Sequence, residues 1–144
     1  MSHPTFAFQH SVLFIDDIAK SENFIRTGLL AYPVHFEFCA GILEDAIQAI
    51  EKSTHDILVV SLQFQDGLVL DFAQHVQKHF HQISSIYMVE QNLLQLQSQV
   101  LKYGALEVFP RPADASGLIT HVESAVNSHR ALQSRMRRSA TLAS

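Results

Sequence analysis

The chain has 144 residues, a mass of 16.2 kDa and a formal net charge of −4. With 47% hydrophobic and 17% charged residues, it is neither a disordered tail nor a heavily charged nucleic-acid binder, and its length suits one domain with a buried core. No apolar run approaches the roughly 20 residues of a membrane-spanning helix, and the first ten residues do not resemble a signal peptide. We therefore expect a cytoplasmic protein.

The charge is unevenly divided along the chain. Residues 1–129 carry all fourteen Asp and Glu against six Lys and Arg, whereas residues 130–144 carry four arginines and no acid. Such a basic tail can contact nucleic acid or an acidic lipid surface, but a solvated helix end has the same composition. We expect an N-terminal extension (1–9), a domain (10–129) and a basic helical extension or linker (130–144).

Strands and helices are predicted to alternate from residue 10 onward. Apolar runs predict strands over residues 10–15 and 34–38. Apolar residues at helical spacing predict helices over residues 19–30 and 42–52. The first half of the domain therefore begins with two β-then-α units.

The third predicted strand is the most apolar. Ile57 to Val60 and Leu62 are apolar, which is typical of a strand covered on both faces in a parallel sheet. Ser61 stands at its carboxyl end, where doubly wound folds place their chemistry. We therefore expect Ser61 to lie in the functional crevice.

The second half continues the same alternation. Asp66 is a candidate N-cap for a helix through Phe80, and a strand over 85–89 and a helix over 92–103 follow. A fifth strand over 105–109 ends at a proline-rich stretch, and a last helix follows it. Five β/α units without hairpin signals predict an α/β fold: a three-layer αβα sandwich with a flavodoxin-like, five-stranded parallel sheet in the order 2-1-3-4-5.

The apolar positions of the last helix continue past the domain. Steps of four and three residues form a seam of roughly three heptads, made up of Leu118, Val122, Ala125, His129, Leu132 and Met136. One interpretation is a coiled coil or helical connector to a partner or output domain. The other is that residues 118–126 pack on the sheet and the remainder is a frayed linker.

Three short motifs indicate a family. The acidic pair Asp16-Asp17 follows the first strand, Asp66-Gly67 begins the third helix, and Gly104-Ala105 through Arg111-Pro112 surround the fifth strand. In the order and spacing of these motifs, the chain resembles the receiver domain of bacterial two-component response regulators over roughly residues 10–129. The resemblance implies a cytoplasmic signalling domain in which Asp16 and Asp17 occupy the places of the metal-binding acidic pair.

Three positions depart from the receiver pattern. Ser61 stands where receivers have the aspartate that accepts the phosphoryl group, and a neutral hydroxyl does not replace an ionised carboxylate in that role. Val89 or Glu90 stands where receivers use Thr or Ser to follow the phosphoryl group. Arg111 replaces a lysine, which keeps the cation but changes its shape.

These departures predict a degenerate pocket with no catalytic residues. Its members are Asp16, Asp17, Ser61, Val89, Glu90 and Arg111. We expect Arg111 to pair with Asp16, Asp17 or Glu90 and to hold the site shut without phosphate. No cofactor is expected, except for weak Mg²⁺ binding by Asp16, Asp17 and the Gln63 carbonyl. A second possible metal site comprises Asp71, His75 and His79 on the third helix, although surface histidines on helices are usually solvated.

The leading hypothesis is therefore a phosphorylation-independent signalling and protein-interaction module, not an enzyme. It is expected to act on a protein partner or a fused output domain and to form a homodimer. The predicted interface residues are Leu93, Tyr103, Phe109, Leu118, Val122, Leu132 and Met136.

Two alternatives remain open from the sequence. In the first, the chain is a phospho-accepting receiver that uses Asp66, Asp16 or Asp17 with Mg²⁺. In the second, its arginine tail contacts nucleic acid directly.

Overall fold

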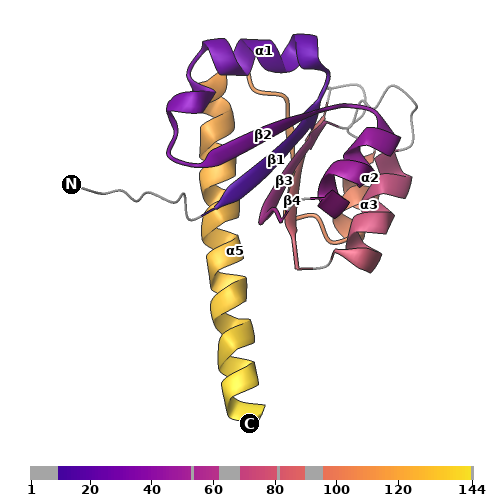
Figure 1. Ribbon diagram of the computed structural model, residues 1–144, viewed down its shortest axis with the longest axis vertical. Coiled ribbons are helices and arrows are strands. Elements are labelled where there is room, and N and C mark those ends of the chain that lie inside the picture. Colours follow the sequence, from indigo (N-terminus) through magenta and orange to yellow (C-terminus); the bar gives the residue numbers. More distant parts are fainter. Residues whose placement is uncertain (1–9, 53, 62–68, 81, 90–95, 144) are drawn as a thin grey trace, which may run out of the picture.

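The computed structural model describes residues 10–52, 54–61, 69–80, 82–89 and 96–143. Its strands form one five-stranded sheet in the order β2-β1-β3-β4-β5, with every neighbouring pair parallel (Figure 1). The strands are β1 (Ser11–Asp16), β2 (His35–Ala40), β3 (Ile57–Ser61), β4 (Ser84–Val89) and β5 (Glu107–Pro110). This topology confirms the predicted flavodoxin-like order.

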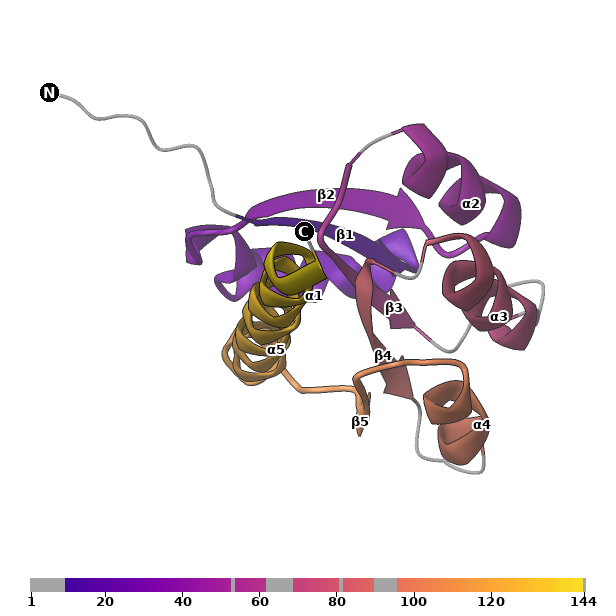
Figure 2. The same ribbon diagram turned by 90° about the horizontal axis from the view of Figure 1, so that it is seen from below.

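Helices cover both faces of the sheet. They are α1 (Ile18–Arg26), the 3-10 helix η1 (Leu29–Ala31), α2 (Leu43–Lys52), α3 (Val69–His79), α4 (Gln97–Lys102) and α5 (Ala115–Ala143). Figure 2 shows α1 and α5 on one face and α2, α3 and α4 on the other. The predicted three-layer sandwich is therefore confirmed.

The central strand shows why the sequence forms a covered sheet. All five residues of β3 are buried, and alternate side chains of a strand point to opposite faces. Val59 joins the core under α1 and α5, whereas Leu58 and Val60 join the core under α2 and α3. An uninterrupted apolar strand is the expected result, because neither face of β3 meets water.

Some predicted boundaries change. The helix predicted over 19–30 ends at Arg26, because Gly28 takes a positive φ of 123° that a helix does not contain, and a short 3-10 turn follows. The fifth strand begins at Glu107 rather than at residue 105. The predicted starts of the third and fourth helices, at Asp66 and Asn92, lie outside the described residues.

The last helix continues without a break across the predicted boundary at residue 129 and projects past the sheet (Figure 1). The side chains on one face of α5, from Ala115 to His129, are buried. Leu132 is half-buried, and Met136 is 50% exposed. The helix therefore has a docked half and a projecting half.

This division corrects the predicted interface. Leu118 and Val122 are fully buried in the core of a single chain, and Phe109 is 2% exposed. These three side chains are not available to a second chain, because they already pack on their own sheet. Tyr103, Leu132 and Met136 keep exposed surface, and Leu93 lies outside the described residues.

Candidate functional site

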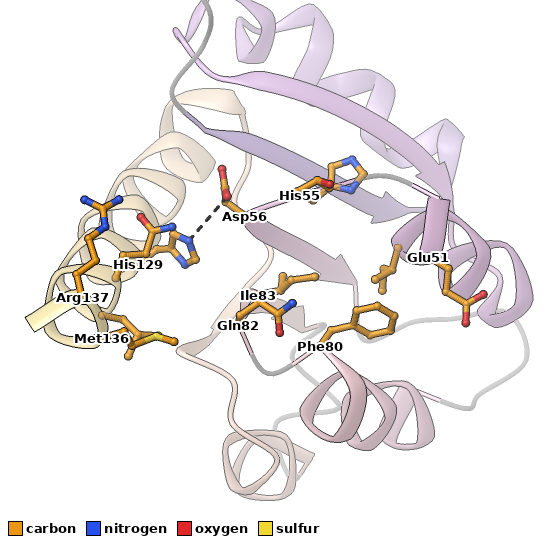
Figure 3. A pocket seen from close by; sticks show the side chains of 13 residues that line it. Glu51, His55, Asp56, Phe80, Gln82, Ile83, His129, Met136 and Arg137 are labelled. Carbon is orange, nitrogen blue, oxygen red and sulfur yellow. Dashed lines mark ion pairs between the residues drawn. The ribbon is translucent and has the colours of Figure 1, made fainter. Parts of the chain in front are cut away.

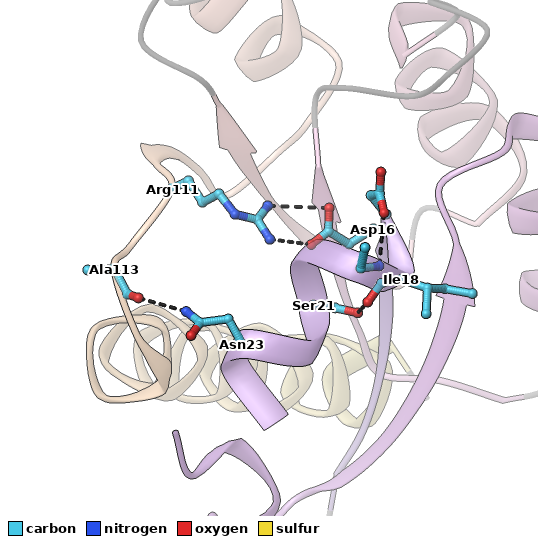
Figure 4. Close-up of polar contacts among 8 residues, drawn as sticks. Asp16, Ile18, Ser21, Asn23, Arg111 and Ala113 are labelled. Carbon is cyan, nitrogen blue, oxygen red and sulfur yellow. Dashed lines mark hydrogen bonds and ion pairs between the residues drawn. The ribbon is translucent and has the colours of Figure 1, made fainter. Parts of the chain in front are cut away.

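An ion pair closes the side of the sheet at which the strands have their carboxyl ends, which we call the carboxyl edge. Asp16 ends β1 and Arg111 follows β5, so the pair joins two strands that are not neighbours. The guanidinium donates two hydrogen bonds to the carboxylate, Nη2 to Oδ2 at 2.6 Å and Nη1 to Oδ1 at 3.3 Å (Figure 4). Of the three predicted partners of Arg111, the structure shows Asp16 in this role.

The surroundings of Arg111 hold this geometry. Its backbone N–H donates to the carbonyl of Val89 at 3.1 Å, and its guanidinium carbon lies 4.9 Å from the centre of the Phe24 ring. Such stacking and a two-bond fork suit arginine rather than lysine. The side chain of Asp16 is 1% exposed, so the cation compensates a carboxylate that is removed from water.

Asp17 has a separate local role. Its Oδ1 accepts a hydrogen bond from the Ala19 N–H at 2.9 Å, so Asp17 is the N-cap of α1. Asn23, further along α1, donates to the Ala113 carbonyl at 2.8 Å and ties the helix to the loop that carries Arg111 (Figure 4). The acidic pair is therefore divided between an ion pair and a helix cap.

The other predicted pocket residues follow the same edge. Ser61 ends β3 and is 4% exposed, and Val89 ends β4 and is 1% exposed. Because Ile15 pairs with Val60 in the sheet, Asp16 and Ser61 stand at equivalent ends of adjacent parallel strands. The structure thus brings Asp16, Ser61, Val89 and Arg111 to one edge, whereas Gln63 and Glu90 lie outside the described residues.

The arrangement is a poor fit for a resident Mg²⁺. Mg²⁺ needs open oxygen ligands in a near-octahedral set, but both carboxylate oxygens of Asp16 face Arg111, and Asp17 caps a helix. Within the described ranges, no three His, Cys, Asp or Glu side chains are grouped to hold a metal ion. Asp71, His75 and His79 are therefore not grouped in this way, although the rings of His75 and His79 lie 4.7 Å apart.

A second polar cluster, which the sequence did not predict, lies where the strands have their amino ends. We call this side of the sheet the amino edge. His10 and His129 are buried beside Asp56, and Ser84 Oγ lies 2.7 Å from His129 Nδ1. These residues come from four separate segments, so no local motif marks them. The available signal was a polar His129 among apolar residues of the α5 seam.

The strand order and the helices on both faces define an α/β protein with a flavodoxin-like, receiver-type fold. Neither a protein-family model nor a curated protein sequence matches this chain.

Solved structures of response regulators resemble it instead. NtrX from Brucella abortus has a TM-score of 0.78 and 15% identity over 89% of this chain and 29% of its own. A response regulator from Clostridium difficile has a TM-score of 0.71 and 18% identity over 83% and 97%. The signal receiver domain of a putative Luxo repressor protein from Vibrio parahaemolyticus has a TM-score of 0.75 and 19% identity over 86% and 95%.

These similarities establish the fold. The chain spans less than a third of NtrX and nearly all of the Clostridium difficile and Vibrio parahaemolyticus structures. Within the described residues, no helix has both the length and the apolar character needed to cross a bilayer.

Proposed function

We propose that this chain is a receiver-type signalling module that works without phosphoryl transfer at Ser61 and acts in the cytoplasm on a protein partner or a fused output domain. The similarity to one part of NtrX supports a place beside further domains, because the matched segment of NtrX is only 29% of that chain. Exposed surface on Tyr103, Leu132 and Met136 supports contact with a partner or a second copy.

One observation carries the proposal: the two-bond ion pair between Asp16 and Arg111. A phosphoryl acceptor needs an ionised carboxylate and a metal ion to neutralise the donor oxygens. Here the strand end carries the hydroxyl of Ser61. Among the described residues, Asp16 at the equivalent end of β1 already accepts from Arg111 with both carboxylate oxygens. Arg111 therefore offsets the charge of Asp16 without Mg²⁺ or phosphate.

The test is incubation of the whole chain with acetyl phosphate and Mg²⁺, followed by intact-mass spectrometry and amide NMR with beryllofluoride. We expect no phosphoryl adduct and no amide shifts at Asp16, Ser61 or Val89. A stable adduct on the unaltered chain would show that a non-standard aspartate accepts phosphate, and the proposal would be wrong.

Two variants locate the cause. We expect Ser61→Asp to remain unmodified, because Arg111 still occupies Asp16, and we expect the double variant Ser61→Asp, Arg111→Lys to regain an adduct. Ser124→Asp is a matched control, since Ser124 is exposed on α5. An adduct on Ser61→Asp alone would mean that only the acceptor was lost.

A further inference from the structure

The described residues form a cavity of about 480 Å³ at the edge of the sheet opposite Asp16 and Arg111 (Figure 3). It lies among the amino ends of β3 and β4, the ends of α2 and α3, and the projecting half of α5. Its volume falls within the roughly 300–1,000 Å³ that is usual for small-molecule sites. The cavity is therefore large enough for an organic molecule.

The lining combines an apolar surface with polar and charged residues, namely Glu51, Thr54, His55, Asp56, Gln82, His129, Gln133 and Arg137. The apolar side chains are Ile50, Phe80, Ile83, Leu132 and Met136. Asp56 and His129 lie close together on one wall, and a dashed line joins them in Figure 3. In small-molecule sites, polar groups beside an apolar surface fix the orientation of the ligand.

The protonation of His129 follows from its neighbours. Its Nε2 faces Asp56 Oδ1 at 3.9 Å, and its Nδ1 lies 2.7 Å from Ser84 Oγ. A proton on Nε2 is favoured beside a carboxylate, so the Ser84 hydroxyl donates to Nδ1. His129 thus presents an N–H toward Asp56 from beyond hydrogen-bond distance.

The other oxygen of Asp56 already has neighbours. Oδ2 accepts from the Ser11 N–H at 3.2 Å and lies 3.6 Å from His10 Nδ1. Arg130 Nε donates to His10 Nε2 at 3.2 Å, which leaves the His10 proton on Nδ1, toward Asp56. These contacts hold the carboxylate in place through Oδ2. Oδ1 and the His129 N–H face each other across 3.9 Å, which is too far for a direct hydrogen bond.

We propose that this cavity binds an uncharged small molecule with an apolar body and one hydroxyl group, the hydroxyl lying between His129 and Asp56. An oxygen at about 2.8 Å from each group fits the 3.9 Å separation, accepting from Nε2–H and donating to Oδ1. Between these two groups an ammonium group cannot accept the His129 proton, and a carboxylate is repelled by Asp56, although Glu51 and Arg137 also line the cavity. A hydroxyl satisfies both partners.

The position of the cavity gives such binding a consequence for α5. Leu132 and Met136 belong to the projecting half of the helix, whereas Ile50, Phe80 and Ile83 belong to the body. A bound apolar molecule would bury surface from both and hold that half of α5 against the body. The inference does not depend on the proposed function, because the cavity shares no residue with the carboxyl edge.

The experiment uses three probes with the same phenylbutyl body: 4-phenylbutan-1-ol, butylbenzene and 4-phenylbutyrate. Each is titrated into the ¹⁵N-labelled whole chain, and affinity is measured from amide shifts. We expect the alcohol to shift amides of Asp56, Ile83 and Leu132 and to bind at least about tenfold more tightly than either other probe. Absence of shifts at the cavity, or equal affinity for alcohol and hydrocarbon, would overturn the proposal.

A pair of variants on α5 tests the site. Met136→Lys places a charge on the apolar wall at a half-exposed position that tolerates substitution, and we expect the alcohol affinity to fall at least about fivefold. Ala131→Lys adds the same charge at an exposed position outside the lining and should leave the affinity unchanged. Equal losses of affinity in both variants would overturn the proposal. Changes in the amide shifts of cavity residues when the protein is diluted without a probe would also overturn it, because they would show that a second copy of the chain occupies the cavity.

Discussion

The two edges of the sheet each hold a carboxylate, but they differ in how closely cationic or N–H donor groups approach it. At the carboxyl edge, Arg111 donates to both oxygens of Asp16, at 2.6 and 3.3 Å, and stacks over Phe24. At the amino edge, the imidazoles of His10 and His129 approach Asp56 no closer than 3.6 and 3.9 Å. The first carboxylate is fully engaged within the chain, and the second is not.

This difference separates the two edges by what they can still bind. A buried charge whose hydrogen bonds are made inside the protein gains little from an outside group, whereas an incompletely bonded charge beside a cavity gains more. The resemblance to receivers predicts a functional site at the carboxyl edge. The contacts instead favour ligand binding at the amino edge, where the cavity adjoins α5.

The largest expected effect comes from breaking the engaged pair. Arg111→Ala leaves Asp16 buried without its cation, and we expect a loss of about 3 kcal/mol in the free energy of unfolding. Urea denaturation followed by circular dichroism measures it. Arg111→Lys is the control, because it keeps a cation with fewer bonds and should lose less than half as much. A loss below about 1 kcal/mol in Arg111→Ala would contradict a tightly engaged pair.

A smaller effect is expected at the amino edge. Ser84→Ala removes the hydroxyl that lies 2.7 Å from His129 Nδ1 and leaves that buried nitrogen without its partner. We expect a loss of about 1–2 kcal/mol in the free energy of unfolding. Ser124→Ala, at an exposed position on α5, should change stability by less than about 0.5 kcal/mol. Equal changes in the two variants would mean that the Ser84 contact contributes nothing specific.

Local pattern was sufficient to predict most of the fold. Apolar runs such as Ile57 to Val60 mark buried strands, and regular β/α alternation leaves few possible sheet orders. The early end of α1 was missed because it depends on the positive φ of Gly28. The spacing of the α5 seam left two interpretations open, because packing on a sheet and packing on a second helix select the same apolar spacing, as at Leu118 and Val122.

The site was predicted only in part, for a related reason. The pairing of Asp16 with Arg111 was predictable, because both residues belong to motifs at strand ends. The amino-edge cluster depends on the parallel register that places Asp56 beside Ser11 and Ser84, through backbone hydrogen bonds of 3.0 Å. It also depends on α5 passing these strand ends so that His129 lies beside Asp56 and Ser84. Neither relation is visible as spacing along the sequence.

The smallest expected effect is a pH dependence that belongs to the amino edge. Burial lowers the pKa of His129 below its ordinary value of 6.5, and His10 lowers it further, while Asp56 partly offsets both. The unfolded chain therefore binds this proton more readily than the folded chain does. Stability from His129 is present above about pH 6.5 and is lost as the pH falls below it.

We test this with urea denaturation at pH 7.5 and pH 5.5 for the unaltered chain and for His129→Asn, whose amide oxygen still accepts from Ser84. The charged and titratable neighbours of His129, namely Asp56, Arg130 and His10, are present in both proteins, as are the other histidines. The difference between the two pH responses therefore belongs to residue 129. We expect the unaltered chain to lose more stability on acidification than the variant. An equal or greater loss in His129→Asn would mean that the imidazole is as easily protonated in the fold as in water, and that the amino edge is no less engaged than the carboxyl edge.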